Sequence, residues 1–398
     1  MKAPGVAVLD LGTSRVVCAM VKATGDGDLH VVARAEAASR GLRRGVPTDL
    51  DETAKSIDTA VREVQRTVGS EIESLVVSVS GAHLEGLNGQ GYKPIVPRGR
   101  HITYQDVMEV VTHSRSLVLP PDREQVQAIP REFRVDGIRD VKRPIGMGGG
   151  TLEAITFIVT GSVSSVQNVE RAVSITGRKV DQMVVAPLAA GLGVLTQEEI
   201  DLGVVVVDIG AGTTDVGVFT HGSLSSAASL PVGAGLVTSD LSKLLKASPE
   251  EAERLKITHA LAVSKGLSER ETVEVTQLGQ SEARPLQRKV LCEIAEARLR
   301  EIAIMVAQHI EKAGLTGMLP GGVVLTGGGA KMTGMDKLFQ EELRSTNVRI
   351  AQEVGTGSAV AMGMARFVLH CHDDLVPASG PDGWKDRVRT LFSIFQKS

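Results

Sequence analysis

The stretch VVVVDIGAGTTDVGVF, Val204 to Phe219, runs from four valines into an aspartate and then into a loop of small residues. An earlier stretch, VAVLDLGTSRVVCAMV from Val6 to Val21, follows the same plan of apolar run, Asp, apolar residue, Gly, small residues with Thr, and apolar run. Internal repeats are the first signal to seek in a sequence, because they report related structural units. The pair predicts two related lobes, each opening with the same strand–loop–strand unit.

Both loops have the composition of a phosphate-binding turn. A glycine turn between strands exposes successive backbone N–H groups, which bind anions, and missing side chains allow the backbone to approach closely. Carboxylates would repel phosphates, so Asp10 and Asp208 are expected near a bound Mg²⁺, through its water ligands. The other loop residues expected at the phosphates are Gly12, Thr13, Ser14, Gly210, Gly212, Thr213 and Thr214.

Other phosphate motifs do not fit these loops. A P-loop needs GxxxxGK[ST], and no lysine follows these glycines; the dinucleotide fingerprint needs a third glycine, where Asp215 stands. Either copy alone could be an ordinary hairpin turn. The two copies together, with LTGGGA downstream, favour a nucleotide site.

Composition sets the class of protein. With 398 residues, 42% of them hydrophobic and 23% charged, the chain should form two or more globular lobes. Its net charge of −3 disfavours a nucleic-acid binder. Three scattered cysteines indicate a reducing compartment, and the short apolar run at the start does not suit a signal peptide.

The pattern along the chain indicates an α/β protein with an insertion. Gly, Pro and Arg rise from residue 82 to 160, where short strands and a helix at Tyr104–Ser116 are expected. A long helix is expected from about Pro285 to Ala313. The predicted organisation is a first lobe of 1–81 and 161–202, an inserted subdomain of 82–160, a second lobe of 203–240 and 318–370, a further subdomain of 241–317, a linker of 371–383 and a terminal helix of 384–398.

These motifs together resemble the actin-like ATPase superfamily, in which two α/β lobes clasp a nucleotide and each lobe supplies one phosphate hairpin. The resemblance covers Val6 to Phe367 and implies ATP with Mg²⁺ as ligand. The segment AERLK is similar to the superfamily's ribose and adenine segment, and TGGGA to its adenosine loop. The residues implied there are Glu253, Lys256, Gly327, Gly328 and Gly329.

Within the superfamily the chain resembles the FtsA family of bacterial division proteins, through SVSGAHLEGLNGQG, IPREFRVDGIRDVKRPIGM, PVGAGLVTSDLS and the region around the second hairpin. The resemblance implies an actin-like fold with an FtsA-type inserted subdomain, self-polymerisation into filaments, and contacts with other division proteins. It also implies binding of the FtsZ C-terminal peptide, for which Arg284, Arg288 and Arg298 are the candidates; a solvated basic face is the alternative.

One position departs from the superfamily pattern. Several of its ATPases carry an acid just before the proline of the segment that matches VVAPLAAG, and this chain has Ala186 there. A positioned acid or amide commonly orients the attacking water in phosphoryl transfer. ATP binding with weak or no hydrolysis is therefore expected. Two other functions stay open: a small-molecule kinase of the same superfamily, and an FtsA-like scaffold of the type IV pilus.

The C-terminal tail has the pattern of a membrane-binding helix. Trp384, Val388, Leu391, Phe392 and Phe395 share one helical face, flanked by basic residues. An amphipathic helix of this kind binds at the interface of anionic lipid, so a peripheral position on the cytoplasmic side of the membrane is expected. Docking of this helix on the protein's own core is the alternative. HCHDD, residues 370–374, has metal-type residues, but their adjacency disfavours a metal site.

Overall fold

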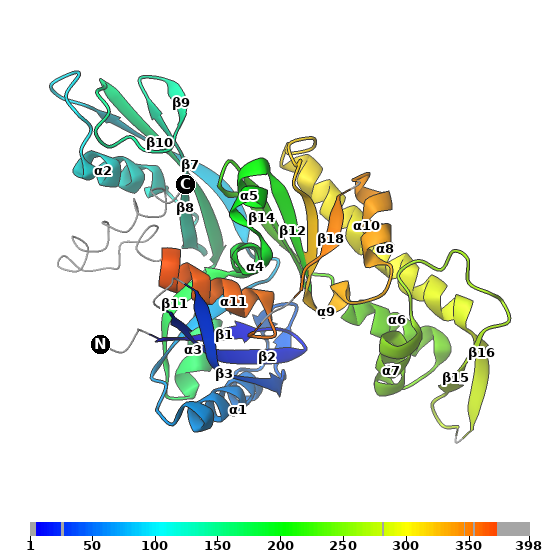
Figure 1. Ribbon diagram of the computed structural model, residues 1–398. Coiled ribbons are helices and arrows are strands. Elements are labelled where there is room, and N and C mark those ends of the chain that lie inside the picture. The colour runs from blue at the N-terminus through cyan, green and yellow to red at the C-terminus, as the bar shows by residue number, and fades with distance from the viewer. Residues whose placement is uncertain (1–4, 25–27, 281, 346, 353–354, 372–398) are drawn as a thin grey trace.

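The computed structural model describes residues 5–371, apart from 25–27, 281, 346 and 353–354. Two α/β lobes lie side by side, and a smaller unit projects from each of them (Figure 1). The expected linker beyond Cys371 and the expected terminal helix lie outside the described residues.

Each lobe is built on a five-stranded sheet, and the two sheets share one topology. The first has the order β11-β6-β1-β2-β3 and the second β14-β13-β12-β17-β18. In both, three antiparallel strands in chain order are followed by two parallel strands. The strands are β1 (Gly5–Leu11), β2 (Arg15–Ala23), β3 (Leu29–Ala38), β6 (Ser74–Val79), β11 (Lys179–Val185), β12 (Val204–Ile209), β13 (Thr214–Thr220), β14 (Ser223–Leu230), β17 (Gly322–Thr326) and β18 (Val348–Ile350). The repeat read from the sequence is thus a repeat of whole sheets.

Two helices, α4 (Ala186–Val194) and α11 (Ala359–Arg366), lie between the sheets. They pack so closely that a Cβ atom on Gly363 would lie 1.6 Å from the carbonyl oxygen of Ala189. The hydrophobic cluster around them includes Val8 of the first sheet, Val206 of the second and Met364 of α11. The lobes therefore share a continuous apolar core around these two helices, which fixes the relative position of the two hairpins.

Further helices pack around the two lobes. In the first lobe, α1 (Leu50–Val68) and α3 (Val163–Ile175) contact each other, and the short strands β4 (Leu42–Arg43) and β5 (Val46–Pro47) precede α1. Asp49 caps α1 by accepting the N–H of Glu52, and Gly69 ends it in the left-handed conformation. The second lobe carries α5 (Gln197–Leu202), α9 (Gly327–Ala330), α10 (Met335–Leu343) and, after α11, a π-helical turn at Phe367–Cys371.

A subdomain next to the second sheet contains α6 (Gly235–Leu245), α7 (Pro249–His259), the hairpin β15 (Thr272–Thr276) and β16 (Ala283–Gln287), and the long helix α8 (Arg288–Lys312). The sequence-based start of the long helix at Pro285 is wrong, because Pro285 lies in β16 opposite Glu274. A proline N atom cannot donate to the ladder, but the hairpin has two strands only, so each strand has a free edge. The helix begins three residues later.

The inserted subdomain is a four-stranded antiparallel sheet of order β7-β10-β8-β9 with α2 (Tyr104–Arg115) packed on it. Its strands are β7 (Glu85–Pro94), β8 (Arg123–Val135), β9 (Ile138–Val141) and β10 (Thr151–Ser162). Gly89 and Gly91 allow the helix to lie directly on β7, since a Cβ on Gly89 would lie 1.9 Å from the carbonyl oxygen of Ser114. The helix expected at Tyr104–Ser116 is confirmed to within one residue.

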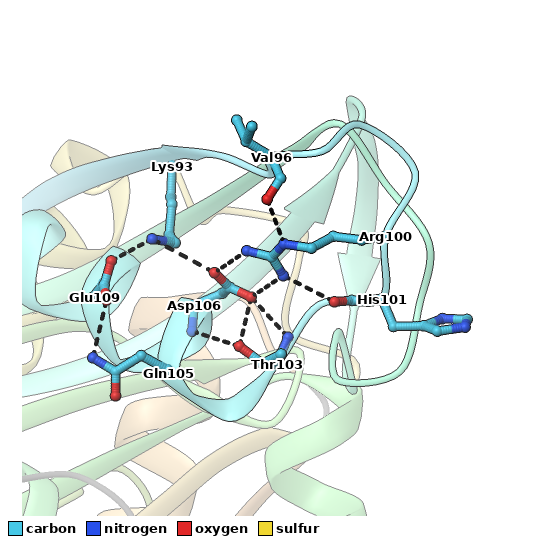
Figure 2. A network of polar contacts seen from close by, with 8 residues as sticks. All are labelled: Lys93, Val96, Arg100, His101, Thr103, Gln105, Asp106 and Glu109. Atoms are coloured by element: carbon cyan, nitrogen blue, oxygen red, sulfur yellow. Dashed lines mark hydrogen bonds and ion pairs between the residues drawn. The ribbon is translucent and has the colours of Figure 1, made fainter.

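A polar network fixes the start of α2 to the loop before it (Figure 2). Arg100 donates to both carboxylate oxygens of Asp106, at 2.6 and 2.8 Å. Asp106 also accepts the backbone N–H of Thr103 at 2.8 Å, which completes a capping box. Lys93 of β7 bridges Asp106 and Glu109. The Arg100 guanidinium therefore holds the pKa of Asp106 well below its ordinary value.

Candidate nucleotide cleft

A cleft of about 560 Å³ lies between the lobes. Both hairpin loops contribute to its walls, as do α7, the glycine segment that begins at Gly327 and the start of α11. Twelve of the residues expected from the sequence line it: Asp10, Gly12, Thr13, Ser14, Asp208, Gly210, Thr213, Glu253, Lys256, Gly327, Gly328 and Gly329. Segments more than 300 residues apart in the chain, such as Asp10 and Gly329, therefore meet at one cavity.

In the first hairpin Asp10 is fixed by two serines. Ser78, in the neighbouring strand β6, donates to one carboxylate oxygen at 3.0 Å, and Ser358 donates to the other at 2.6 Å. Ser358 also caps α11 by accepting the N–H of Ala361 at 3.2 Å. The carboxylate is thus held at the point where β1, β6 and the helix between the lobes meet.

The second hairpin touches the first across the cleft. Gly212 has no room for a side chain, because a Cβ there would lie 2.6 Å from Thr13 Oγ1. Gly327 adopts a φ of +85°, and a Cβ on it would lie 2.1 Å from Asp208 Oδ1. Gly328, by contrast, has nothing within 4 Å of its Cβ position. The glycines therefore bring three backbone segments together around an open space, as a bound phosphate group would require.

Two of the expected residues lie beside the cleft and not on its wall. Gly212 packs against Thr13, as described, and Thr214 is fully buried and donates its hydroxyl to the carbonyl oxygen of Val232 at 2.9 Å. Thr214 pairs with Ile209 as the first residue of β13, which explains its inward position. Its hydroxyl therefore has a partner within the second lobe, and its expected role as a phosphate donor stays a prediction.

A buried carboxylate that sequence analysis did not assign to the site lies at the same end of the cleft. Asp215 lines the cleft although it is only 5% exposed. Ser80 donates to it at 2.9 Å, and Thr213 at 3.4 Å. Burial raises the pKa of Asp215 to about 6, against the hydrogen bonds from Ser229 and Ser80, with a smaller contribution from the negative charge of Asp10. The sequence signal that could have assigned Asp215 to the site was its position two residues after Thr213.

The opposite end of the cleft carries the residues expected at ribose and base. Lys256 of α7 pairs with Glu253 at 2.7 Å and donates to Thr238 Oγ1 at 2.9 Å. Thr238 in turn donates to Glu253. Ile257 and Leu261 add apolar surface to this wall. The arrangement offers a carboxylate and an ammonium group beside an apolar surface, which suits a sugar hydroxyl and a base.

The three candidate partner-binding arginines have different surroundings. Arg288 lines the cleft, where it donates to the carbonyl oxygen of His259 at 3.0 Å and pairs with Glu271 at 3.1 Å. Arg298 pairs with Asp240 at 2.7 Å and with Glu301. Arg284 lies in β16 and is exposed. The structure therefore does not gather them on one free basic face, and Arg288 belongs to the cleft.

The described residues contain neither a metal-binding cluster nor a membrane-spanning helix. Within residues 5–371, outside the gaps given above, no group of three or more His, Cys, Asp and Glu residues is arranged to hold a metal ion. The same part of the chain contains no helix that is long and apolar enough to cross a membrane. The membrane-binding candidates Trp384 to Phe395 lie outside the described residues, as does most of HCHDD.

The sequence is similar to cell division proteins over most of its length. It is 36% identical to the cell division protein FtsA of Pseudomonas aeruginosa over 333 residues, which are 84% of this chain and 79% of the relative. Identity to FtsA of Bacillus subtilis is 35%, over 86% of this chain and 77% of the relative.

The chain belongs to the FtsA family.

Two family models match this FtsA-family chain. The model for cell division protein FtsA matches residues 205–365, and the model for the SHS2 domain inserted in FtsA matches residues 81–160. The second match falls on the segment that sequence analysis predicted as an insertion. The chain is thus a cell-division protein with an actin-like fold.

Solved structures share the fold at low sequence identity. A PilM–PilN type IV pilus biogenesis complex has a TM-score of 0.62 at 17% identity, covering 90% of this chain and 97% of that one. MreB5 of Spiroplasma citri bound to ADP has a TM-score of 0.58 at 14% identity, covering 91% of this chain and 95% of that one. These likenesses confirm the actin-like fold class.

Proposed function

We propose that this FtsA-family protein binds Mg-ATP in the interlobe cleft, polymerises on the cytoplasmic face of the membrane and anchors FtsZ filaments there. The observation that carries the nucleotide assignment is the meeting of both hairpin loops at one cavity, with Gly212 in contact with Thr13. Family membership supports the division role, and a fold relative with ADP bound supports the ligand class.

The residues present fit Mg-ATP. The loops Gly12–Ser14 and Gly210–Thr213 would hold the phosphates through backbone N–H groups and hydroxyls, and Glu253 with Lys256 would hold the sugar and base. Asp10 and Asp208 are hard oxygen ligands suited to the water shell of Mg²⁺. The metal ion, when bound, neutralises phosphate charge.

We infer that hydrolysis is slow or absent. Ala186, at the start of α4, lines the cleft where several superfamily members carry an acid, and its methyl group cannot orient water. Asp215 is a carboxylate on the cleft wall, and because three hydroxyl groups hold it, it would support slow turnover at most. ATP then serves mainly to fix the lobes in one arrangement, and polymerisation follows the nucleotide state.

Membrane attachment is proposed for the tail. One helix with five apolar residues and basic flanks binds weakly, because ordering it costs about 1 kcal/mol or more per residue. Many tails on one filament would bind firmly, through raised effective concentration. Attachment would therefore depend on polymerisation.

The test is co-sedimentation with anionic vesicles, with and without FtsZ C-terminal peptide. We expect the full chain to pellet with vesicles in the presence of Mg-ATP and to retain the labelled peptide. Removal of residues 384–398, or Phe392→Glu, should leave the protein in the supernatant with its peptide affinity unchanged. Undiminished pelleting of both variants would exclude the tail as anchor. Vesicle binding without peptide binding would favour the pilus-type scaffold.

A further inference from the structure

The peptide between Ser80 and Gly81 lies where the chain leaves the first sheet for the inserted subdomain. Ser80 follows β6, the strand next to β1 and its hairpin. The Ser80 hydroxyl lies 2.9 Å from each carboxylate oxygen of Asp215 and 2.9 Å from Ser229 Oγ. The N–H of Gly81 donates to the same Ser229 hydroxyl at 2.8 Å. This contact joins the first lobe to β13 and β14 of the second.

The polar groups of this cluster satisfy one another. Ser229 Oγ accepts the N–H of Gly81 and shares a hydrogen bond with Ser80 Oγ, in which either hydroxyl can donate, and the Ser229 hydroxyl also lowers the pKa of Asp215 through a hydrogen bond. Ser80 donates its proton to the same carboxylate. Asp215 and Ser229 are each only 5% exposed. Because buried polar groups that lose a partner are costly, a shift of Asp215 should move both serines with it.

The first hairpin reaches the same peptide from the other side. Gly45, in the turn between β4 and β5, donates its N–H to Thr13 Oγ1 at 3.3 Å. A Cβ on Gly45 would lie 2.9 Å from the carbonyl carbon of Ser80, so the turn rests directly on this peptide. Thr13 and Asp215 both line the cleft. The peptide is therefore held between contacts from both hairpins.

From the Ser80–Gly81 peptide, contacts continue to the two segments that join the inserted subdomain to the first lobe, one before β7 and one at the end of β10. His83 Nδ1 accepts the N–H of Ser162, at the end of the returning strand, at 3.3 Å. Arg123 donates to the carbonyl oxygens of His83 at 3.0 Å and Thr160 at 3.1 Å. A displacement of Gly81 would therefore reach the outgoing and returning strands together.

We infer that the Asp215–Ser229–Ser80 cluster couples the phosphate end of the cleft to the two strands that carry the inserted subdomain. Ser80 and Ser229 act as positioning residues: they hold Asp215 toward the cleft and transmit its position to Gly81. The inference rests on the proposed nucleotide binding. Energetic coupling of this kind passes through contiguous hydrogen-bonded groups and requires that the ligand change one of them.

The test is hydrogen–deuterium exchange of the full chain with Mg-ADP and with the Mg²⁺ complex of a non-hydrolysable ATP analogue. Peptides that cover 81–94 and 151–163 should exchange at different rates with the two nucleotides. Ser80→Ala and Ser229→Ala should remove most of this difference, while both affinities, measured by calorimetry, stay within about threefold of wild type. Ser225→Ala is the matched control, because Ser225 is buried in the same strand and bonds Thr220 within its own lobe.

The outcomes separate the two proposals. Failure of the wild type to bind either nucleotide would overturn the proposed function itself. Binding with no difference in exchange at 81–94 and 151–163, or a difference that persists in Ser229→Ala, would overturn the coupling alone. Where Ser80→Ala lowers the melting temperature too far, Ser80→Thr keeps a hydroxyl group and should restore the difference; its failure to do so in a folded protein would also count against the coupling.

Discussion

The two hairpins have loops of the same length but face different partners. In the first, Leu11 pairs with Val16, and in the second, Ile209 pairs with Thr214, so four residues form each loop. The aspartate before each loop is opposite Val17 in the first hairpin and opposite Asp215 in the second. The two copies of the repeat therefore share the glycine-containing loop. They differ in an extra carboxylate, Asp215, on β13, the strand that follows the second loop.

Because of this difference, the carboxylates of the two hairpins contact different parts of the molecule. Asp10 is held by Ser78 and Ser358, near the helix between the lobes. Asp215 is held by Ser80, at the boundary of the inserted subdomain. The first hairpin thus connects the cleft to the interlobe core and reaches the Ser80–Gly81 peptide through the Gly45 turn, whereas the second contacts Ser80 directly. A nucleotide that touches both loops would act on two parts of the molecule.

The largest expected effect comes from Gly212→Val, which breaks the contact between the hairpins. A Cβ at this position already lies 2.6 Å from Thr13 Oγ1, so valine must displace the first loop. We expect ATP affinity to fall by well over tenfold, about 1.4 kcal/mol or more. Calorimetric titration measures it, with Gly148→Ala in the inserted subdomain as the fold control. ATP binding of wild-type strength in a folded variant would contradict the contact.

A smaller effect is expected from Asp215→Val, which gives the second hairpin the apolar partner of the first. Any ATP turnover should be lost, while ATP affinity should fall less than in Gly212→Val, because the loop itself is intact. Single-turnover hydrolysis measures the turnover, and calorimetric titration measures the ATP affinity. Thr220→Val, at another buried position of β13, is the control. Turnover equal to wild type would show that the extra carboxylate is not used.

The same carboxylate should make stability depend on pH. The pKa of Asp215 is raised from 3.8 to about 6 in the folded protein, so the folded state binds the proton more tightly than the unfolded state. Ionisation of Asp215 therefore destabilises the fold above pH 6, and stability is regained as pH falls toward 4. Relative to Asp215→Asn, the wild type should gain about 1 kcal/mol or more between pH 7.5 and 5.

Urea unfolding without nucleotide or Mg²⁺ measures this difference at each pH. Parallel stability curves for wild type and Asp215→Asn would contradict the raised pKa. The first hairpin offers the matched comparison, because Val17 occupies the equivalent place and carries no proton.

The smallest effect is expected in the subdomain that carries α8, away from the hairpins. Arg284→Glu and Arg298→Glu should weaken binding of the acidic FtsZ peptide, most clearly at low salt, and leave ATP affinity unchanged. Arg298 is already paired with Asp240, so we expect the exposed Arg284 to contribute at least as much. Arg288→Glu should lower ATP affinity instead. Fluorescence anisotropy that shows no loss in either of the first two variants would place the docking site elsewhere.

The sequence predicted the parts of the cleft that are local in the chain. Each hairpin, the glycine segment at Gly327 and the helix with Lys256 are short motifs whose backbone conformation depends on nearby residues. Their repetition then predicted that two lobes would bring them together. The insertion was predicted from a change in composition, and a family model places the SHS2 domain at residues 81–160.

The rest depends on contacts between distant residues, which periodicity cannot report. Ser80 and Ser229 are 149 positions apart, and only the tertiary fold makes them partners of Asp215. Arg288 was assigned to a docking face through the resemblance to the FtsA family, yet it lines the cleft at the start of α8. The role of Arg100 in fixing α2 likewise depends on where Asp106 folds.

The most direct test of the account is a titration of ATP onto the full chain with and without Mg²⁺, for wild type, Asp10→Asn, Asp208→Asn and the double variant. If both hairpins hold one Mg-ATP, the wild type binds one equivalent, and each single substitution weakens binding by about tenfold or more. The double variant should then lose less than the sum of the two effects, because both carboxylates serve the same ion. Affinity independent of Mg²⁺, or loss on substitution of only one aspartate, would contradict a site shared by the two hairpins.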